Sequence, residues 1–133
     1  MTVIQAVQSG FRRYAKFSGR ATRSEFWFWV LFTVVGGVVG EVLDLLVFGY
    51  HSINFAPITE LFWLGTLLPS FAVMVRRLHD TDRSGWWWLL GIVPLVGQLA
   101  LIVLCCLKGT RGYNRFGADR IPPPKQIIRP RAA

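Results

Sequence analysis

The densest group of residues that could do chemistry is Arg76, Arg77, His79 and Asp80, within one five-residue stretch. Two adjacent guanidinium groups next to a titratable imidazole are suited to binding a phosphate or another anion. On a helix, Arg76 and Asp80 lie four residues apart and can pair, whereas Arg77 and His79 diverge. We therefore predict an anion-binding site at these four residues.

A second candidate site combines small residues with carboxylates. Within an arc of roughly 140° on one helix, the pattern places Thr33, Gly36, Gly37, Gly40, Glu41 and Asp44. Gly36 and Gly40 allow a second helix to approach closely, so we predict a helix contact there. Glu41, Asp44 and Glu60, together with Gln98, form a candidate acidic site for a proton or cation. In the simpler alternative, Asp44 and Glu60 are solvated and only Glu41 lies among apolar residues.

The composition indicates what kind of element positions these residues. The chain has 133 residues, enough for one domain, and is 53% hydrophobic and only 17% charged. Its net charge of +8 alone would suit a nucleic-acid-binding protein. A mean hydropathy of +0.42 argues against nucleic acid as a partner and favours a membrane protein.

Three apolar segments are long enough to cross a membrane, namely residues 26–48, 55–75 and 86–107. As helices they would be about 31 to 34 Å long, close to the ~30 Å hydrocarbon thickness. Backbone amides cannot remain unpaired in lipid. We therefore predict an all-α, polytopic membrane protein with three hydrophobic helices.

The ends of the chain differ from these segments. Residues at helical spacing predict an N-terminal amphipathic helix at the membrane interface, with a break at Gly10: Val3, Ile4, Val7, Phe11 and Tyr14. Thr22 and Glu25 fit a capping box, which predicts that the first long helix begins near Arg23. The sequence from Lys108 is rich in Gly and Pro. We assign residues 1–121 to one membrane domain, ending in a capping turn, and residues 122–133 to a disordered basic tail.

The distribution of charge predicts the orientation of the chain. Residues 1–25 and 76–85 carry an excess of cations, whereas residues 41–60 carry three carboxylates and no Lys or Arg. The positive-inside rule places the first two regions in the cytoplasm and the third outside. A third span would put the seven cations of residues 108–133 outside, against this rule. Length favours a span for residues 86–107, which we predict, and charge favours the alternative, a re-entrant hairpin broken at Pro94 and Gly97.

This orientation gives the anion site a chemical identity, a lipid headgroup at the inner surface. In the alternative interpretation, Arg76 and Arg77 only anchor the chain and Asp80 caps a turn. A metal-dependent phosphohydrolase built on His79 and Asp80 would need further histidines, and we expect the only other one, His51, on the opposite face. We predict no catalytic residue, no metal and no cofactor.

Four strings occur in a fixed order: SGRATRSEFWFW at 18–29, RRLHDTDRSGWWWLL at 76–90, VPLVG at 93–97 and KGTRGYNRFGAD at 108–119. Together they resemble the small bacterial inner-membrane family called domain of unknown function 805. The resemblance covers nearly the whole chain and implies a cytoplasmic-membrane protein, with no activity attached. The chain departs from the pattern at Asp82 and Arg83, where Gly-Lys is usual, and at Ala118 and Arg120, where prolines often stand. The first departure argues against a tight glycine-type turn at Asp82.

We interpret the chain as a multi-pass protein of the bacterial inner membrane that binds rather than catalyses. The expected partners are anionic lipid headgroups, together with further copies of the chain or an envelope protein. One alternative is a small oligomeric transporter of protons or cations that uses Glu41 and Asp44. The other is an enzyme acting on lipid headgroups through Arg76, Arg77 and His79.

Overall fold

The computed structural model describes residues 1–49 and 55–121, and its regular elements are all helices. In chain order these are α1 (Val3–Arg12), α2 (Arg23–Phe48), α3 (Pro57–Asp80), the 3₁₀ helix η2 (Gly85–Ile92) and α4 (Val96–Cys106). Over the described ranges there is no β-strand, only an isolated bridge between Asn114 and Gly117. The predicted all-α class is confirmed. The predicted disordered tail at 122–133 and the predicted position of His51 fall outside the described residues.

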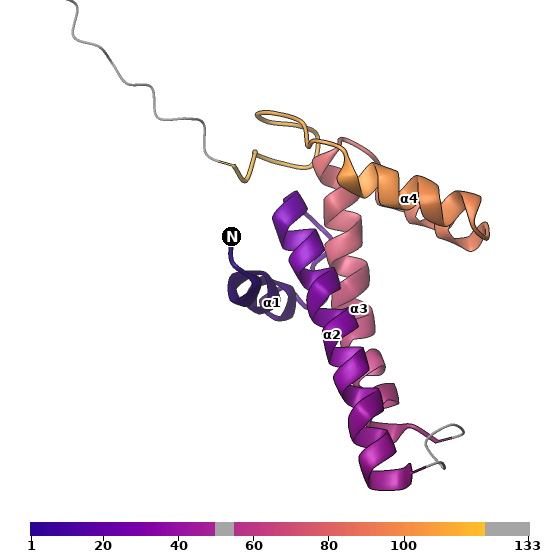
Figure 1. Ribbon diagram of the computed structural model, residues 1–133. Helices are drawn as coiled ribbons and strands as arrows, with labels where there is room; N and C mark the ends of the chain where they lie inside the picture. The colour runs from indigo at the N-terminus through magenta and orange to yellow at the C-terminus, as the bar shows by residue number, and fades with distance from the viewer. Residues whose placement is uncertain (50–54, 122–133) are drawn as a thin grey trace, which may run out of the picture.

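The long axis of the molecule is a hairpin of α2 and α3, which run side by side (Figure 1). They contain 26 and 24 residues and are about 39 and 36 Å long. Both are long and apolar enough to cross a membrane. Their outward faces carry exposed aliphatic side chains, such as Leu46 at 76% and Leu64 at 68% exposure. Water would be a poor solvent for such faces, whereas lipid is a good one.

Small residues on α2 set how closely α3 approaches. A Cβ atom added at Gly36 would lie 2.3 Å from the Phe62 ring, and one at Gly40 would lie 3.2 Å from the Cα of Thr59. Real Cβ atoms do not fit at such distances without a shift of the neighbour. The stripe that the sequence predicts as a helix contact therefore faces α3 of the same chain.

The beginning of α2 differs in one respect from the predicted capping box. The helix starts at Arg23, as predicted, and the Thr22 hydroxyl accepts a hydrogen bond of 3.2 Å from the Glu25 amide. The Glu25 carboxylate does not complete the box. It is directed instead to side chains of other elements, described below.

α1 lies across α2, so that Figure 1 shows it almost end-on. The side that packs on α2 includes Ala6 and Gly10, which are buried, and Phe11, whose ring lies 5.3 Å from that of Trp29 and 5.9 Å from that of Phe32 between centroids. Ile4 is exposed. The helix continues through Gly10 to Arg12, and the predicted break is wrong. The reason is packing, because a Cβ at Gly10 would lie 2.2 Å from the Trp29 ring. Glycine costs helix propensity here but lets α1 approach α2.

Residues 86–107 do not form the third spanning helix that their length predicts. They form η2 and the 11-residue α4, with a turn at Val93–Leu95 in which Leu95 has φ of +59°. Pro94 lies in this turn, and a Cβ at Gly97 would overlap the Leu90 carbonyl oxygen at 1.7 Å. The turn and the close approach fold the segment back on itself. The two candidate spans in the described residues are α2 and α3.

Both ends of this folded segment lie at the same end of α3. η2 follows α3 after a short turn, and at the other end of the segment the Arg77 side chain donates hydrogen bonds to the backbone oxygens of Cys105, at 3.0 Å, and Leu107. The chain after α4 therefore returns to the end of α3 (Figure 1). This is the geometry of the hairpin alternative, which the sequence supported only through its charges.

Candidate functional site

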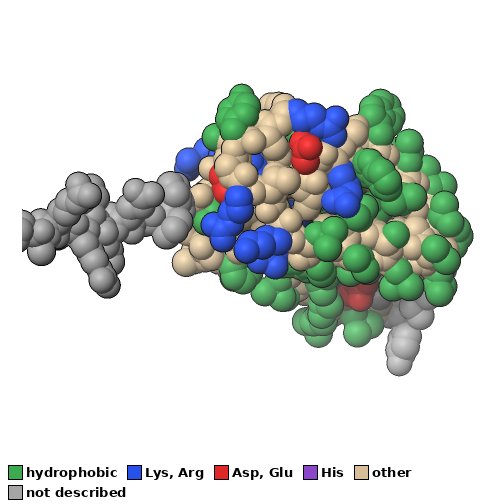
Figure 2. Space-filling model, turned by 90° about the horizontal axis from the view of Figure 1, so that it is seen from above, with side chains coloured by type: hydrophobic (Ala, Val, Ile, Leu, Met, Phe, Trp, Pro, Cys, Tyr) green, Lys and Arg blue, Asp and Glu red, His purple; other side chains and the backbone are tan. Residues whose placement is uncertain are grey.

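The end of the hairpin where α2 begins and α3 finishes holds most of the charge of the protein. We call it the basic end. Of the 15 Lys and Arg, three lie beyond residue 121, and the other 12 lie at this end or on elements packed against it. Seen from above, charged side chains occupy the centre of this face and hydrophobic side chains surround them (Figure 2). The opposite end of the described hairpin carries carboxylates alone, Glu41, Asp44 and Glu60.

Inside the basic end, six charged residues from distant parts of the chain form an arginine network: Arg20, Glu25, Arg76, Arg77, Asp80 and Arg120. Arg76, Arg77 and Glu25 have no exposed surface. Arg76 and Arg77, which are predicted to bind a headgroup, are therefore among the most deeply buried residues of the protein. Buried charges need opposite charges and hydrogen bonds, and the network supplies both.

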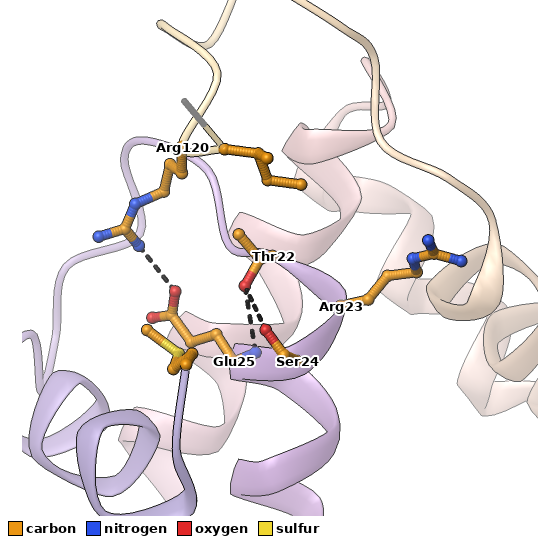
Figure 3. A pocket seen from close by; sticks show the side chains of 7 residues that line it. Thr22, Arg23, Ser24, Glu25 and Arg120 are labelled. Carbon is orange, nitrogen blue, oxygen red and sulfur yellow. Dashed lines mark hydrogen bonds and ion pairs between the residues drawn. The ribbon is translucent and has the colours of Figure 1, made fainter. Parts of the chain in front are cut away.

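Half of the network is centred on Glu25. Its carboxylate pairs with Arg76 of α3 at 3.2 Å and with Arg120 of the C-terminal segment at 2.7 Å. The Ser9 hydroxyl of α1 donates to the same carboxylate at 2.9 Å. Figure 3 shows the guanidinium of Arg120 meeting Glu25 from the C-terminal segment. One carboxylate thus joins α1, α2, α3 and the C-terminal segment.

The other half is centred on Asp80. Its two oxygens pair with Arg20 at 2.9 Å and with Arg77 at 2.5 Å. The predicted pair between Arg76 and Asp80 is wrong. Arg77, three residues before Asp80, takes that place, because Arg76 faces Glu25 of α2.

Most of the remaining donors of the buried arginines hold backbone oxygens, whereas the Nη2 of Arg76 is buried with no partner among the described residues. Arg20 donates to the oxygens of Gly112, at 2.6 Å, Gly117, at 3.3 Å, and Thr110. Arg77 donates to the oxygen of Ala21, at 3.3 Å, in addition to those at the end of α4. These guanidinium groups fix the chain around them and have few donors left for an external anion.

His79 lies apart from the network. Its Nδ1 is 3.2 Å from the Gly19 oxygen, and its ring stacks on Phe116, with 3.9 Å between centroids and 3° between planes. Of the four residues predicted as one anion site, the structure brings together Arg77 and Asp80. It directs Arg76 to Glu25, and His79 to Phe116.

The C-terminal segment folds back over the network as a turn, as predicted. The backbone groups of Asn114 and Gly117 pair with each other, and the Asn114 side chain donates to the His79 oxygen at 2.9 Å. Gly109 passes so close to Asp80 that a Cβ would lie 2.0 Å from a carboxylate oxygen. Asp82 adopts a left-handed conformation with φ of +58°. The turn that the departure from Gly-Lys called into question is therefore present, since aspartate is one of the few other residues that tolerate this conformation.

Of the acidic residues at the opposite end, Glu41 and Asp44 line one pocket together with Thr59, whereas Glu60 does not line it. Gln98, on α4, lies outside this pocket. Asp44 is fully buried, and its two carboxylate oxygens accept hydrogen bonds from the amides of Ile58, at 3.0 Å, and Thr59, at 2.9 Å. It therefore caps α3, whose own preceding residue provides no side-chain cap. Glu41 and Glu60 are exposed. Because Asp44 is buried and accepts hydrogen bonds from these two amides, the alternative in which it is solvated is wrong.

This capping role gives a testable prediction for the acidic end. Asp44→Ala removes the acceptors of two amides in a part of the chain that water reaches poorly, so we expect the free energy of unfolding to fall by about 1–2 kcal/mol. Asp44→Asn retains one oxygen and should lose less. The midpoint of unfolding in detergent, followed by tryptophan fluorescence, measures both. Glu41→Ala and Glu60→Ala are the controls, and a loss as large in either of them would contradict the assignment.

Three members of the network are not among the site residues predicted from the sequence, namely Arg20, Glu25 and Arg120. For Glu25 the sequence predicts only a local capping role. Its position directly before an apolar segment is the signal that could have indicated a buried ion pair. Arg120 pairs with Glu25, which lies 95 residues earlier in the chain, so no local pattern marks it.

The fold and the site together define a class, a small helical membrane protein with two candidate spans and a charged, buried joint at one end. Residues 14–118 match the family described as "Protein of unknown function (DUF805)". The chain is 44% identical over 110 residues to the inner membrane protein YhaI of Escherichia coli (strain K12), covering 81% of this chain and 88% of that protein. It is 41% identical over 108 residues to the inner membrane protein YhaH of the same organism, covering 81% and 89%.

A third relative, the uncharacterized protein YiiR of Escherichia coli (strain K12), is 35% identical over 130 residues, with 77% and 84% coverage. No solved structure matches the chain significantly. The chain belongs to the DUF805 family, as the four strings predicted. It is a protein of the bacterial inner membrane, consistent with its two long apolar helices.

Proposed function

We propose that the basic end of this protein binds the anionic headgroups of the cytoplasmic leaflet, while α2 and α3 cross the membrane. The observation that carries this proposal is the separation of charge along the hairpin. Every described Lys and Arg lies at or near one end, and the carboxylates Glu41, Asp44 and Glu60 lie at the other. The positive-inside rule orients such a hairpin with its basic end in the cytoplasm.

The net charge of this end supports headgroup binding. Its four carboxylates already pair with arginines or accept backbone amides: Glu25, Asp80, Asp82 and Asp119. Several cations have no such partner within the described residues, among them Arg12, Lys16 and Lys108. Near an anionic membrane surface, each such cation contributes roughly 1 kcal/mol of attraction.

The η2–α4 hairpin supports a position for this end within the inner leaflet. It contains no charged residue from Gly85 to Leu107, and Trp86, Leu95 and Val96 are each more than 70% exposed. Such a surface is suited to lipid, and tryptophan prefers the interface. A hairpin whose two ends return to the basic end would then be re-entrant, and the basic segment after it would stay in the cytoplasm.

The other functions considered from the sequence have less support. A transporter using Glu41 and Asp44 would need these carboxylates to be free for protons or cations, and Asp44 is engaged in capping α3. An enzyme using Arg76 and Arg77 would need them at a surface, and both are buried. Association with further copies or with an envelope protein is compatible with headgroup binding and is a separate proposal.

The test is the lipid that the full-length protein retains. The protein is reconstituted in bilayers of phosphatidylglycerol and phosphatidylcholine with the same acyl chains, then released and analysed by native mass spectrometry. We expect the retained lipid to be enriched several-fold in phosphatidylglycerol over the bilayer, and the enrichment to fall as salt increases. Retention in the same proportion as the bilayer would overturn the proposal.

A further inference from the structure

We propose that Arg23, Lys108 and Arg111 form a binding site for the phosphate group of an anionic phospholipid. The three residues lie at the rim of a cavity of about 80 Å³ between the start of α2 and the segment after α4. This inference rests on the proposed function, since it places one headgroup at one position of the basic end. It concerns exposed residues that the candidate anion site predicted from the sequence did not include.

The floor of the cavity is already saturated. Arg20 and Asp80 line it and are buried, and they pair with each other at 2.9 Å. The other donors of Arg20 hold the backbone oxygens of Gly112, Gly117 and Thr110. The charges of Arg20 and Asp80 are therefore neutralised within the protein, and the residues at the rim of the cavity determine which ligand binds.

The rim carries free positive charge. Arg23, Lys108 and Arg111 are exposed, and none of them forms an ion pair or a side-chain hydrogen bond within residues 1–49 and 55–121. In Figure 3 the Arg23 side chain points away from Glu25, so it does not join the buried network. Residues 122–133 contain no Asp or Glu, so they bring no side-chain carboxylate to neutralise the rim.

One carboxylate, Asp119, also lines the cavity. Its oxygens accept hydrogen bonds from the amides of Ile121, at 2.9 Å, and Gly112, at 3.3 Å. The bond from Ile121 above all lowers the pKa of Asp119 below its usual value. Asp119 thus stays ionised and offsets one of the three rim cations, leaving an excess of positive charge.

The size and position of the cavity favour a lipid phosphate. A cavity of about 80 Å³ is much smaller than the roughly 300–1,000 Å³ of sites that enclose a whole small molecule, so it admits a group such as phosphate. Arginine binds phosphate through paired N–H donors, and lysine adds a point charge. Lys108 directly follows the apolar residues that end at Leu107, next to exposed Val103 and Cys106 on α4. A phospholipid with its phosphate in the cavity could place its acyl chains along α4.

The test compares two triple variants of the full chain that remove equal charge. The site variant is Arg23→Gln, Lys108→Gln, Arg111→Gln, and the matched control is Arg12→Gln, Lys16→Gln, Arg83→Gln, whose side chains form no described ion pair. The readout is the ratio of phosphatidylglycerol to phosphatidylcholine retained from bilayers of both lipids. Both variants lose general attraction to the anionic surface, and we expect the site variant to lower this ratio about tenfold further than the control does. A charge-preserving variant, Arg23→Lys with Arg111→Lys, should retain most of the wild-type ratio.

The possible outcomes separate the site from the proposed function. Equal losses in both triple variants would overturn the site while leaving general headgroup binding intact. No preference for phosphatidylglycerol in the wild-type protein would overturn both.

Addition of inorganic phosphate, with ionic strength matched by chloride, distinguishes the source of the phosphate group. Displacement of phosphatidylglycerol from the wild type but not from the site variant would show that free phosphate competes for the site, whereas a site variant that loses phosphatidylglycerol with no displacement in the wild type assigns the site to the lipid. Unchanged tryptophan fluorescence shows that each variant is folded, and the charge-preserving variant decides the matter if the site variant is not.

Discussion

Asp80→Asn is expected to lower the free energy of unfolding by about 3–5 kcal/mol, enough to reduce accumulation of the protein in the membrane. The substitution preserves the shape of the side chain but removes its charge. Arg20 and Arg77, which pair with Asp80 and are themselves buried, then remain charged in a poorly solvated place. Arginine cannot escape this by losing its proton. The midpoint of unfolding in detergent, together with the amount of protein in the membrane, measures the effect.

Asp82→Asn is the matched control, two residues away. Asp82 also pairs with an arginine, Arg115, at 3.3 Å, but both side chains are largely exposed. Ion pairs at such sites contribute between zero and about 1 kcal/mol. If Asp80→Asn were no more destabilising than Asp82→Asn, the buried charges would not depend on Asp80 for their stability.

The sequence predicted correctly those features that depend on short stretches of chain. Hydropathy over twenty residues indicated where α2 and α3 lie, and the Thr22 hydroxyl marked the first residue of α2. The spacing of Gly36 and Gly40 indicated a face that another helix could approach. In each case the signal and the structure lie within a few turns of helix, where geometry follows from the spacing of residues.

The arginine network could not be predicted in the same way, because its partners are far apart in the sequence. Glu25 and Arg76 are 51 residues apart, and Arg20 and Asp80 are 60 apart. From local spacing alone, Glu25 is predicted to cap α2, and Arg76 is predicted to pair with Asp80, four residues later. Both local interactions were displaced by tertiary pairs, since a buried charge gains more from a well-placed opposite charge than an exposed one does.

The segment from Trp86 to Leu107 shows two sequence rules in conflict. Its length suits a spanning helix, whereas the basic residues after it suit a return to the cytoplasm. In the structure, residues in the middle of this segment make it fold back on itself. Pro94 sits in the turn, Leu95 takes a left-handed conformation, and Gly97 allows the two arms to meet.

The network brings together three of the four strings through which the sequence resembles the family. The first string supplies Arg20 and Glu25, the second supplies Arg77 and Asp80, and the last supplies the backbone oxygens that Arg20 holds. Together they close one end of the molecule over two helices. The exposed cations Arg23, Lys108 and Arg111 lie next to this network, which fixes the backbone that carries the proposed phosphate site.

Glu25→Leu is expected to cost about 3–5 kcal/mol, because Arg76 is fully buried and loses its counter charge. Arg76→Met should cost less. Glu25 then still pairs with Arg120 and accepts a hydrogen bond from Ser9, so its charge stays compensated. Arg120 itself is a quarter exposed and can be solvated when Glu25 is lost.

The double variant, Glu25→Leu with Arg76→Met, replaces the buried pair by apolar side chains of similar size. Such replacements are often close to neutral, so we expect the double variant to be more stable than Glu25→Leu alone by about 2 kcal/mol or more. The same unfolding measurement on all four proteins gives the coupling energy between the two sites. If the two single losses add to within about 0.5 kcal/mol, Glu25 and Arg76 are not coupled, and the contact between α2 and α3 at the basic end does not depend on this ion pair.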